Sequence, residues 1–201
     1  IRLSRKIIGM VGILLILTVA TAAFALIKLK SIGIELKEIA EEDIPLTEAV
    51  TKMTEYQLEM SIFFERALRM AEKKNWKEFN VHLKHFETAG KEVGVQSQRA
   101  LKITEETIRL AHSAESRAEF RGIKDKLLVI GKENGDFKTH ALEVFHLAEA
   151  GKMEEAETKA VAVEKEADHV DDALEAFLGE VEQFTEQSAL RAEHDEQSAE
   201  K

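Results

Sequence analysis

The sequence predicts an all-α protein, in which one N-terminal transmembrane helix precedes an antiparallel up-down-up-down four-helix bundle with long helices. Its 201 residues contain a single Pro, and 33% of them are charged, which is typical of long helices. Residues 7–27 contain no charged side chain, and apolar residues then recur at spacings of three and four. We therefore divide the chain into an anchor, residues 1–30, and a bundle, residues 31–201.

The anchor prediction rests on the uncharged segment 7–27. About 20 apolar residues in a helix are enough to cross the hydrocarbon core of a bilayer. Basic residues among the first six place the N-terminus in the cytoplasm by the positive-inside tendency, although Lys28 and Lys30 follow the segment. A cleavable signal peptide is the competing interpretation, because Ala23-Phe24-Ala25 has the small-x-small pattern of a cleavage site.

Beyond the anchor, the pattern predicts helices over about residues 31–74, 76–112, 116–149 and 152–199. Asp43-Ile44-Pro45 interrupts the first of them, since Asp is a good N-cap and Pro is tolerated in a first turn, so a new helix or a kink starts there. Lys73-Lys74-Asn75 ends the next stripe, which includes Gln57 among its apolar residues. Ser116-Arg117-Ala118-Glu119 has the spacing of a capping box, and Gly151-Lys152 forms a helix–helix turn.

Composition also bounds the function. The formal net charge of −10 argues against a nucleic acid partner, because the phosphates would be repelled. The sequence has no Cys, which excludes disulfides, thiolate metal ligands and Cys nucleophiles. It also has no Gly-rich phosphate loop and no nucleophile elbow. We therefore expect a protein that is not an enzyme.

Four stretches carry a resemblance to a known family: residues 42–47, Gln57-Leu58-Glu59, Phe64-Glu65-Arg66-Ala67-Leu68-Arg69 and His140-Ala141-Leu142-Glu143-Val144-Phe145. Together with the anchor and the returning bundle, they resemble the N-terminal part of methyl-accepting chemotaxis proteins with four-helix-bundle sensory domains. The likeness is one of pattern and covers most of the chain, but the HAMP linker and signalling hairpin of that family are not in this sequence. Similar sensory bundles occur on histidine kinases and cyclic-dinucleotide enzymes.

The resemblance implies the sensory, ligand-binding region of a bacterial transmembrane signal transducer, with a chemoreceptor as its first candidate. It further implies a homodimer in the bacterial inner membrane, with the bundle in the periplasm and a small ligand or a periplasmic protein as its signal. A bundle whose last helix returns to the membrane also predicts a second membrane helix after Lys201. A different class of function remains open: a membrane-anchored structural or accessory bundle of a larger membrane complex.

Five residues form the candidate site. We expect Glu65 to be partly buried, because it shares a stripe with apolar residues, and we expect His140 and Glu143 to lie on one helix face near the core. His82 and His85 lie at a similar distance from the first distal turn. Because Glu and His converging from several helices build metal sites in bundles, the five residues are predicted to bind a transition metal or an anion near the distal end. The alternative is an ordinary charged flank that needs no cofactor.

A di-iron centre is a less favoured form of the metal hypothesis. Glu143-Val144-Phe145-His146 and Glu166-Ala167-Asp168-His169 both have the Glu-x-x-His pattern of carboxylate-bridged iron bundles. The two motifs lie at different distances from the turn at Gly151, roughly five and seventeen residues, which separates their heights by more than about 15 Å at 1.5 Å per residue. This mismatch disfavours a shared metal centre.

Overall fold

A computed structural model describes residues 2–111 and 114–199. The side chains of residues 2–11, 31, 34–36, 38, 115, 191–192 and 195–199 are outside that description. The helical elements in chain order are α1 (Arg2–Glu38), the π-helical turn η1 (Ile39–Asp43), α2 (Ile44–Glu72), α3 (Trp76–Leu110), α4 (Ala114–Glu149) and α5 (Met153–Ala199). Over the described residues there is no strand, which confirms the all-helical class.

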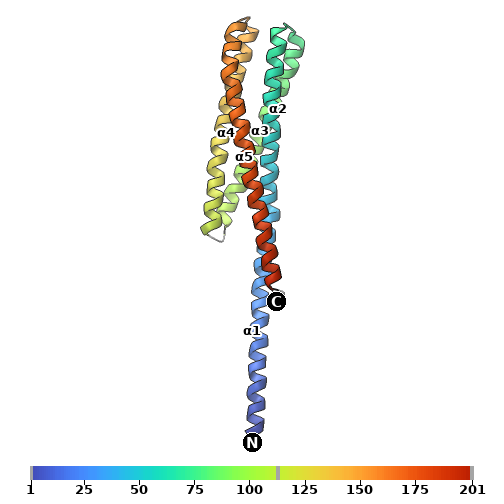
Figure 1. The fold of residues 1–201 in the computed structure, drawn as a ribbon, viewed down its shortest axis with the longest axis vertical. Helices are drawn as coiled ribbons and strands as arrows, with labels where there is room; N and C mark the ends of the chain where they lie inside the picture. The colour runs from blue at the N-terminus through green and yellow to red at the C-terminus, as the bar shows by residue number, and fades with distance from the viewer. Residues whose placement is uncertain (1, 112–113, 200–201) are drawn as a thin grey trace.

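The helices pack side by side along one long axis, and α1 projects beyond them as a single helix (Figure 1). Among the four helices α2 to α5, α2 contacts α3 and α5, α4 also contacts α3 and α5, and α2 and α4 touch each other as well. The α2–α3 and α4–α5 turns both lie at the end remote from the N-terminus, which we call the distal end (Figure 1). At the opposite, proximal end, the last turns of α5 lie beside α1 and η1 (Figure 1).

Both distal turns form as the sequence predicts. In the first, Lys74 adopts a left-handed conformation (φ 56°), and the side chain of Asn75 accepts a 3.3 Å hydrogen bond from the backbone N–H of Glu78. This bond caps the N-terminus of α3. In the second turn Gly151 has a φ of 77°, a region that glycine enters without the steric cost of a Cβ.

Three boundary predictions need correction. Asp43 does not cap a new helix: its backbone is helical, its side chain makes no capping hydrogen bond, and the chain passes through η1 into α2. The wider π turn is the expected response to Pro45, which lacks an N–H and crowds the preceding turn. Ser116 lies inside α4, which begins at Ala114, so Ser116-Glu119 is not an N-terminal capping box. Helix α3 ends at Leu110, whereas the predicted end, His112, lies outside the described residues.

Helix α1 contains the one segment of the described chain that is long and apolar enough to cross a membrane, Gly12–Lys30. Its mean hydropathy is 2.3, and none of its residues is buried by the rest of the protein. Large side chains such as Ile16 and Leu26 are about two-thirds exposed. An apolar segment that the rest of the protein does not bury is poorly suited to water, which is consistent with membrane anchoring.

The interior of α2 to α5 consists of two apolar clusters. The distal core is formed by residues of segments 60–93 and 137–167. It contains five phenylalanines, together with Met60, Leu68 and smaller residues such as Ala67, Ala141 and Ala160. The phenylalanines are Phe64, Phe79, Phe86, Phe137 and Phe145. The proximal core is mainly aliphatic: Leu46, Ala49, Val50, Met53, Ala100, Phe120, Leu127, Ile130, Val170, Leu174, Phe177 and Val181. The two clusters share no residue, and polar side chains lie between them.

Candidate functional site

The five residues predicted to form a metal or anion site occupy different places. Glu65 is exposed, so the prediction of partial burial is wrong: the stripe that includes it turns outward at this position of α2. On α3, His82 and His85 stack against Phe63, with ring centroids 5.9 and 4.8 Å apart. The Nδ1 atom of His82 is buried and has no hydrogen-bond partner.

The other two predicted residues contact α5 instead. The Nδ1 atom of His140 lies 2.7 Å from a carboxylate oxygen of Glu166. The ammonium group of Lys159 donates to the carboxylate of Glu143, and this bond lowers the pKa of Glu143. The α2–α3 pair and the α4–α5 pair therefore hold the predicted residues apart. Among the residues that the structure describes, no three His, Asp or Glu side chains are placed to share a metal ion.

The two Glu-x-x-His motifs do not face each other either. His146 lies 3.6 Å from Glu149 of its own helix, while His169 lies 3.5 Å from Glu133 of α4. Both contacts join an exposed imidazole to a carboxylate, and they do not converge on one point.

The region that the sequence analysis missed is the boundary between the two cores, which we call the polar layer: Gln57 and Ser61 of α2, Asn134 of α4, and Asp171 of α5. The amide of Asn134 donates to the side-chain oxygen of Gln57, and both side chains are buried. The hydroxyl of Ser61 donates to Asp171 at 3.0 Å. These bonds link three helices across the interior. The available signal was Gln57, a polar residue within an otherwise apolar stripe.

Helix α3 contributes Gln96, which lies along that helix between the distal residue Val93 and the proximal residue Ala100. The side-chain oxygen of Gln96 is buried and has no hydrogen-bond partner within the protein. An unpaired buried acceptor costs free energy, because water that would have bonded to it is excluded. All four packed helices therefore place a polar group between the two apolar clusters.

Burial raises the pKa of Asp171 above its ordinary value, and the neighbouring carboxylates Asp168 and Asp172 add to this effect. Hydrogen bonds from Gln57 and Ser61 oppose it, because they stabilise the ionised form. The directional bonds of the polar layer fix how α2, α4 and α5 align along the long axis, since a shifted helix would leave buried amides unpaired.

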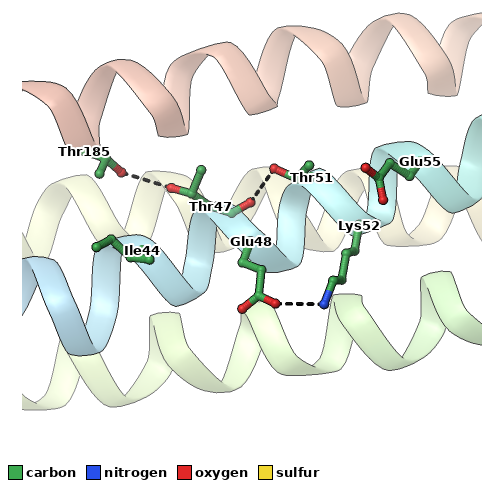
Figure 2. A pocket seen from close by; sticks show the side chains of 7 residues that line it. All are labelled: Ile44, Thr47, Glu48, Thr51, Lys52, Glu55 and Thr185. Atoms are coloured by element: carbon green, nitrogen blue, oxygen red, sulfur yellow. Dashed lines mark hydrogen bonds and ion pairs between the residues drawn. The ribbon is translucent and has the colours of Figure 1, made fainter.

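Two grooves lie in the proximal half. The first, of about 340 Å³, runs along the outer side of α2 next to α5, and Figure 2 shows the side chains that line it. The hydroxyls of Thr47 and Thr185 lie 3.0 Å apart and connect α2 to α5 at one end of this groove (Figure 2). Glu48 is bonded to Lys52 and to Arg99 of α3, and these cations lower the pKa of Glu48.

The second groove, of about 450 Å³, lies between α4 and α5. Its floor is apolar, and ionisable side chains border it: Asp125, Lys126, Glu133, His169 and Glu180. Volumes of this size are typical of sites for small molecules.

The fold and these sites define an all-helical protein with one apolar N-terminal helix and a polar layer inside its packed part. Comparisons with protein-family profiles, with curated proteins and with solved structures give no match for the chain.

Proposed function

We propose that the chain is the sensory region of a bacterial transmembrane signal transducer of the chemoreceptor type. In this proposal, α2 to α5 form an antiparallel up-down-up-down four-helix bundle in the periplasm, α1 anchors it in the inner membrane, and two copies associate as a homodimer. The contacts among α2 to α5 and the two cores that these helices share support the bundle arrangement.

One observation carries the proposal. Helix α1 passes into α2 without leaving the helical conformation, and the end of α5 returns to contact α1 and η1. The beginning and the end of the bundle therefore lie side by side at the end that bears the anchor (Figure 1). A small displacement of α5 along α2 is then delivered to the membrane surface, which is what a transducer with two arrangements requires.

A hybrid receptor tests this function. Residues 1–201 are joined to the second membrane helix, HAMP linker and output module of a well-characterised chemoreceptor, and the activity of the associated kinase is measured. The double variant Thr47→Cys/Thr185→Cys places two sulfurs where the hydroxyls are 3.0 Å apart, close enough for a disulfide to fix α5 against α2. The chain has no native Cys, so no other disulfide competes.

We expect oxidation of the double variant to shift kinase activity several-fold and reduction to reverse the shift. Each single Cys variant is the matched control and should not respond to oxidation. Complete crosslinking with unchanged kinase activity would show that α5 transmits nothing, and would leave an anchored structural bundle as the function.

The periplasmic location has its own test. Thr139 is exposed on α4 near the distal end, so Thr139→Cys offers a single accessible thiol. In cells with a permeabilised outer membrane, a membrane-impermeant maleimide should label this thiol before the inner membrane is broken. Labelling that appears only after lysis of the inner membrane would place the bundle in the cytoplasm and contradict the proposal.

A further inference from the structure

The α4–α5 groove has an apolar floor made possible by small residues. Ala173 and Ala176 of α5 line the groove together with Val129 of α4, and their short side chains leave space between the two helices. Below them Ile130 and Phe177 are 5% and 2% exposed, so they belong to the proximal core and form a firm base. A ligand on this floor would contact both the core and the solvent.

A polar pair that crosses from α4 to α5 marks each end of the groove. Lys126 is paired with Glu180 at the proximal end, and Glu133 lies 3.5 Å from His169 at the distal end. Seven residues separate Lys126 from Glu133, which corresponds to about 10 Å of helix. The apolar floor between the pairs therefore accommodates roughly one aromatic ring with a short side arm.

The charged side chains that border the groove determine which sign of ligand charge is favoured. Three carboxylates border the groove, and its one Lys, Lys126, is paired with Glu180, which leaves Asp125 and Glu133 as the carboxylates without a Lys partner in the groove. The chain as a whole has a formal net charge of −10, so an anion is repelled at long range as well. Face-to-face docking of the same groove on a second copy would bring six carboxylates together with only two lysines, and this excess of negative charge disfavours that occupant.

We propose that the α4–α5 groove binds a small organic cation with an apolar body of about one ring, such as an arylalkylamine. The ring lies on Ile130, Ala173 and Phe177, and the ammonium group lies beside the carboxylate of Glu133. The consequence of binding for signalling rests on the proposed sensory function, but binding itself does not. Because α5 forms one wall of the groove, a ligand here also contacts the helix that returns to the anchor.

The test is calorimetric titration of the full chain in detergent micelles with phenethylammonium. A ligand of this size in a groove of this kind should bind with a Kd of about 0.1–1 mM. Two matched probes of similar shape separate the contribution of charge from that of apolar contact. The neutral 2-phenylethanol should bind several-fold more weakly, and the anion phenylacetate should show no binding. Equal affinity for phenylacetate, or no binding of phenethylammonium, would overturn the inference.

Two variants locate the site. Ala176 is exposed, so Ala176→Leu fills the groove without disturbing the core, and it should weaken phenethylammonium at least tenfold. Glu133→Gln should weaken phenethylammonium several-fold and leave 2-phenylethanol unchanged. The controls are Ala118→Leu and Glu157→Gln, exposed positions that do not line the groove, and neither should alter binding.

Light scattering tests whether a second copy of the chain occupies the groove instead. If Ala176→Leu changes the oligomeric state while phenethylammonium affinity stays at the wild-type value, the groove is a contact between copies and the inference is wrong. The hybrid receptor tests the sensory function separately from ligand binding in the groove. Groove binding without any effect of the Thr47–Thr185 disulfide would preserve the ligand site and remove the sensory role.

Discussion

The distal and proximal cores are built differently although the same four helices form both. In the distal core, the ring of Phe145 lies 5.4 to 5.7 Å from those of Phe64, Phe79 and Phe86, mostly edge to face. Such contacts have a defined geometry and involve three of the four helices. The proximal core is packed mainly by aliphatic side chains, whose contacts have no comparable directionality, and Phe120 forms a ring pair with Phe184 at its edge.

Under the proposed sensory function, this difference gives the two halves different tasks. The interlocked rings hold both hairpins together near their turns, whereas both grooves described above lie in the proximal half, next to the anchor. The polar layer separates the two regions and fixes their alignment. The defined ring contacts of the distal end and the aliphatic packing of the proximal end are consistent with the proposal that α5 shifts against α2 in the proximal half.

The largest expected effect is loss of the central ring. Phe145→Ala removes a fully buried side chain from contact with three other rings, and should lower the free energy of unfolding by about 3–5 kcal/mol. Urea unfolding followed by circular dichroism measures this. Trp76, the sole tryptophan, lies 5.5 Å from Phe79 and reports on the distal half by fluorescence.

Leu174→Ala in the proximal core is the matched comparison, with an expected loss of about 2–4 kcal/mol. In this variant the loss of helix, followed by circular dichroism, should move to lower urea. The unfolding transition reported by Trp76 fluorescence should not occur at a lower urea concentration than the loss of helix. If Leu174→Ala costs more than Phe145→Ala, the distal core is not the firmer half and the division of tasks fails.

The next effect concerns the polar layer. Gln57→Leu leaves the buried amide of Asn134 without its acceptor and should cost about 1–3 kcal/mol. The double variant Gln57→Leu/Asn134→Leu removes both partners and should recover most of that loss. A double-mutant cycle by urea unfolding gives the coupling. Additive losses would mean that the two amides do not act as a pair.

A smaller, pH-dependent effect is expected at Asp171. Burial raises the pKa of Asp171 in the folded state, so protonation of Asp171 favours folding. This contribution to stability is lost as the pH rises from the ordinary pKa of an Asp side chain through the raised pKa of the folded state. Asp171→Asn should therefore raise the Tm at pH 7 by an amount equivalent to less than about 1 kcal/mol. The gain should vanish once the pH falls below the ordinary pKa of aspartic acid. A gain that grows toward acidic pH would contradict this sign.

The smallest effect is expected at the residues that the sequence singled out. Glu65 and Glu143 are exposed, so Glu65→Gln and Glu143→Gln should each change stability by less than about 0.5 kcal/mol, even though the second removes the pair with Lys159. Thermal unfolding with and without added Zn²⁺ checks both the stability and the metal hypothesis. A Tm that rises with Zn²⁺ in the wild type but not in these variants would restore the predicted site.

Local patterns were sufficient for the elements and insufficient for the site. The turns at Lys74 and Gly151 were predictable, because each depends on residues within one turn of itself. The capping assignment of Ser116 failed, since a serine two residues into a helix has the same local sequence as one at its start. The prediction that Glu65 is partly buried failed because a stripe of residues spaced by three and four covers about half of the helix circumference. Residues at the edges of such a stripe face solvent.

The sequence by itself determined that the chain is helical, where its two distal turns lie, and that one apolar helix precedes the packed part. These properties follow from composition and from the 3.6-residue period, which act along the chain. Only the tertiary structure decided which polar side chains meet. Gln57 pairs with Asn134, and Ser61 with Asp171, because helix packing sets the rotation and height of each helix relative to the others. Those relations are absent from any single helix, and they determine where the polar layer and the grooves lie.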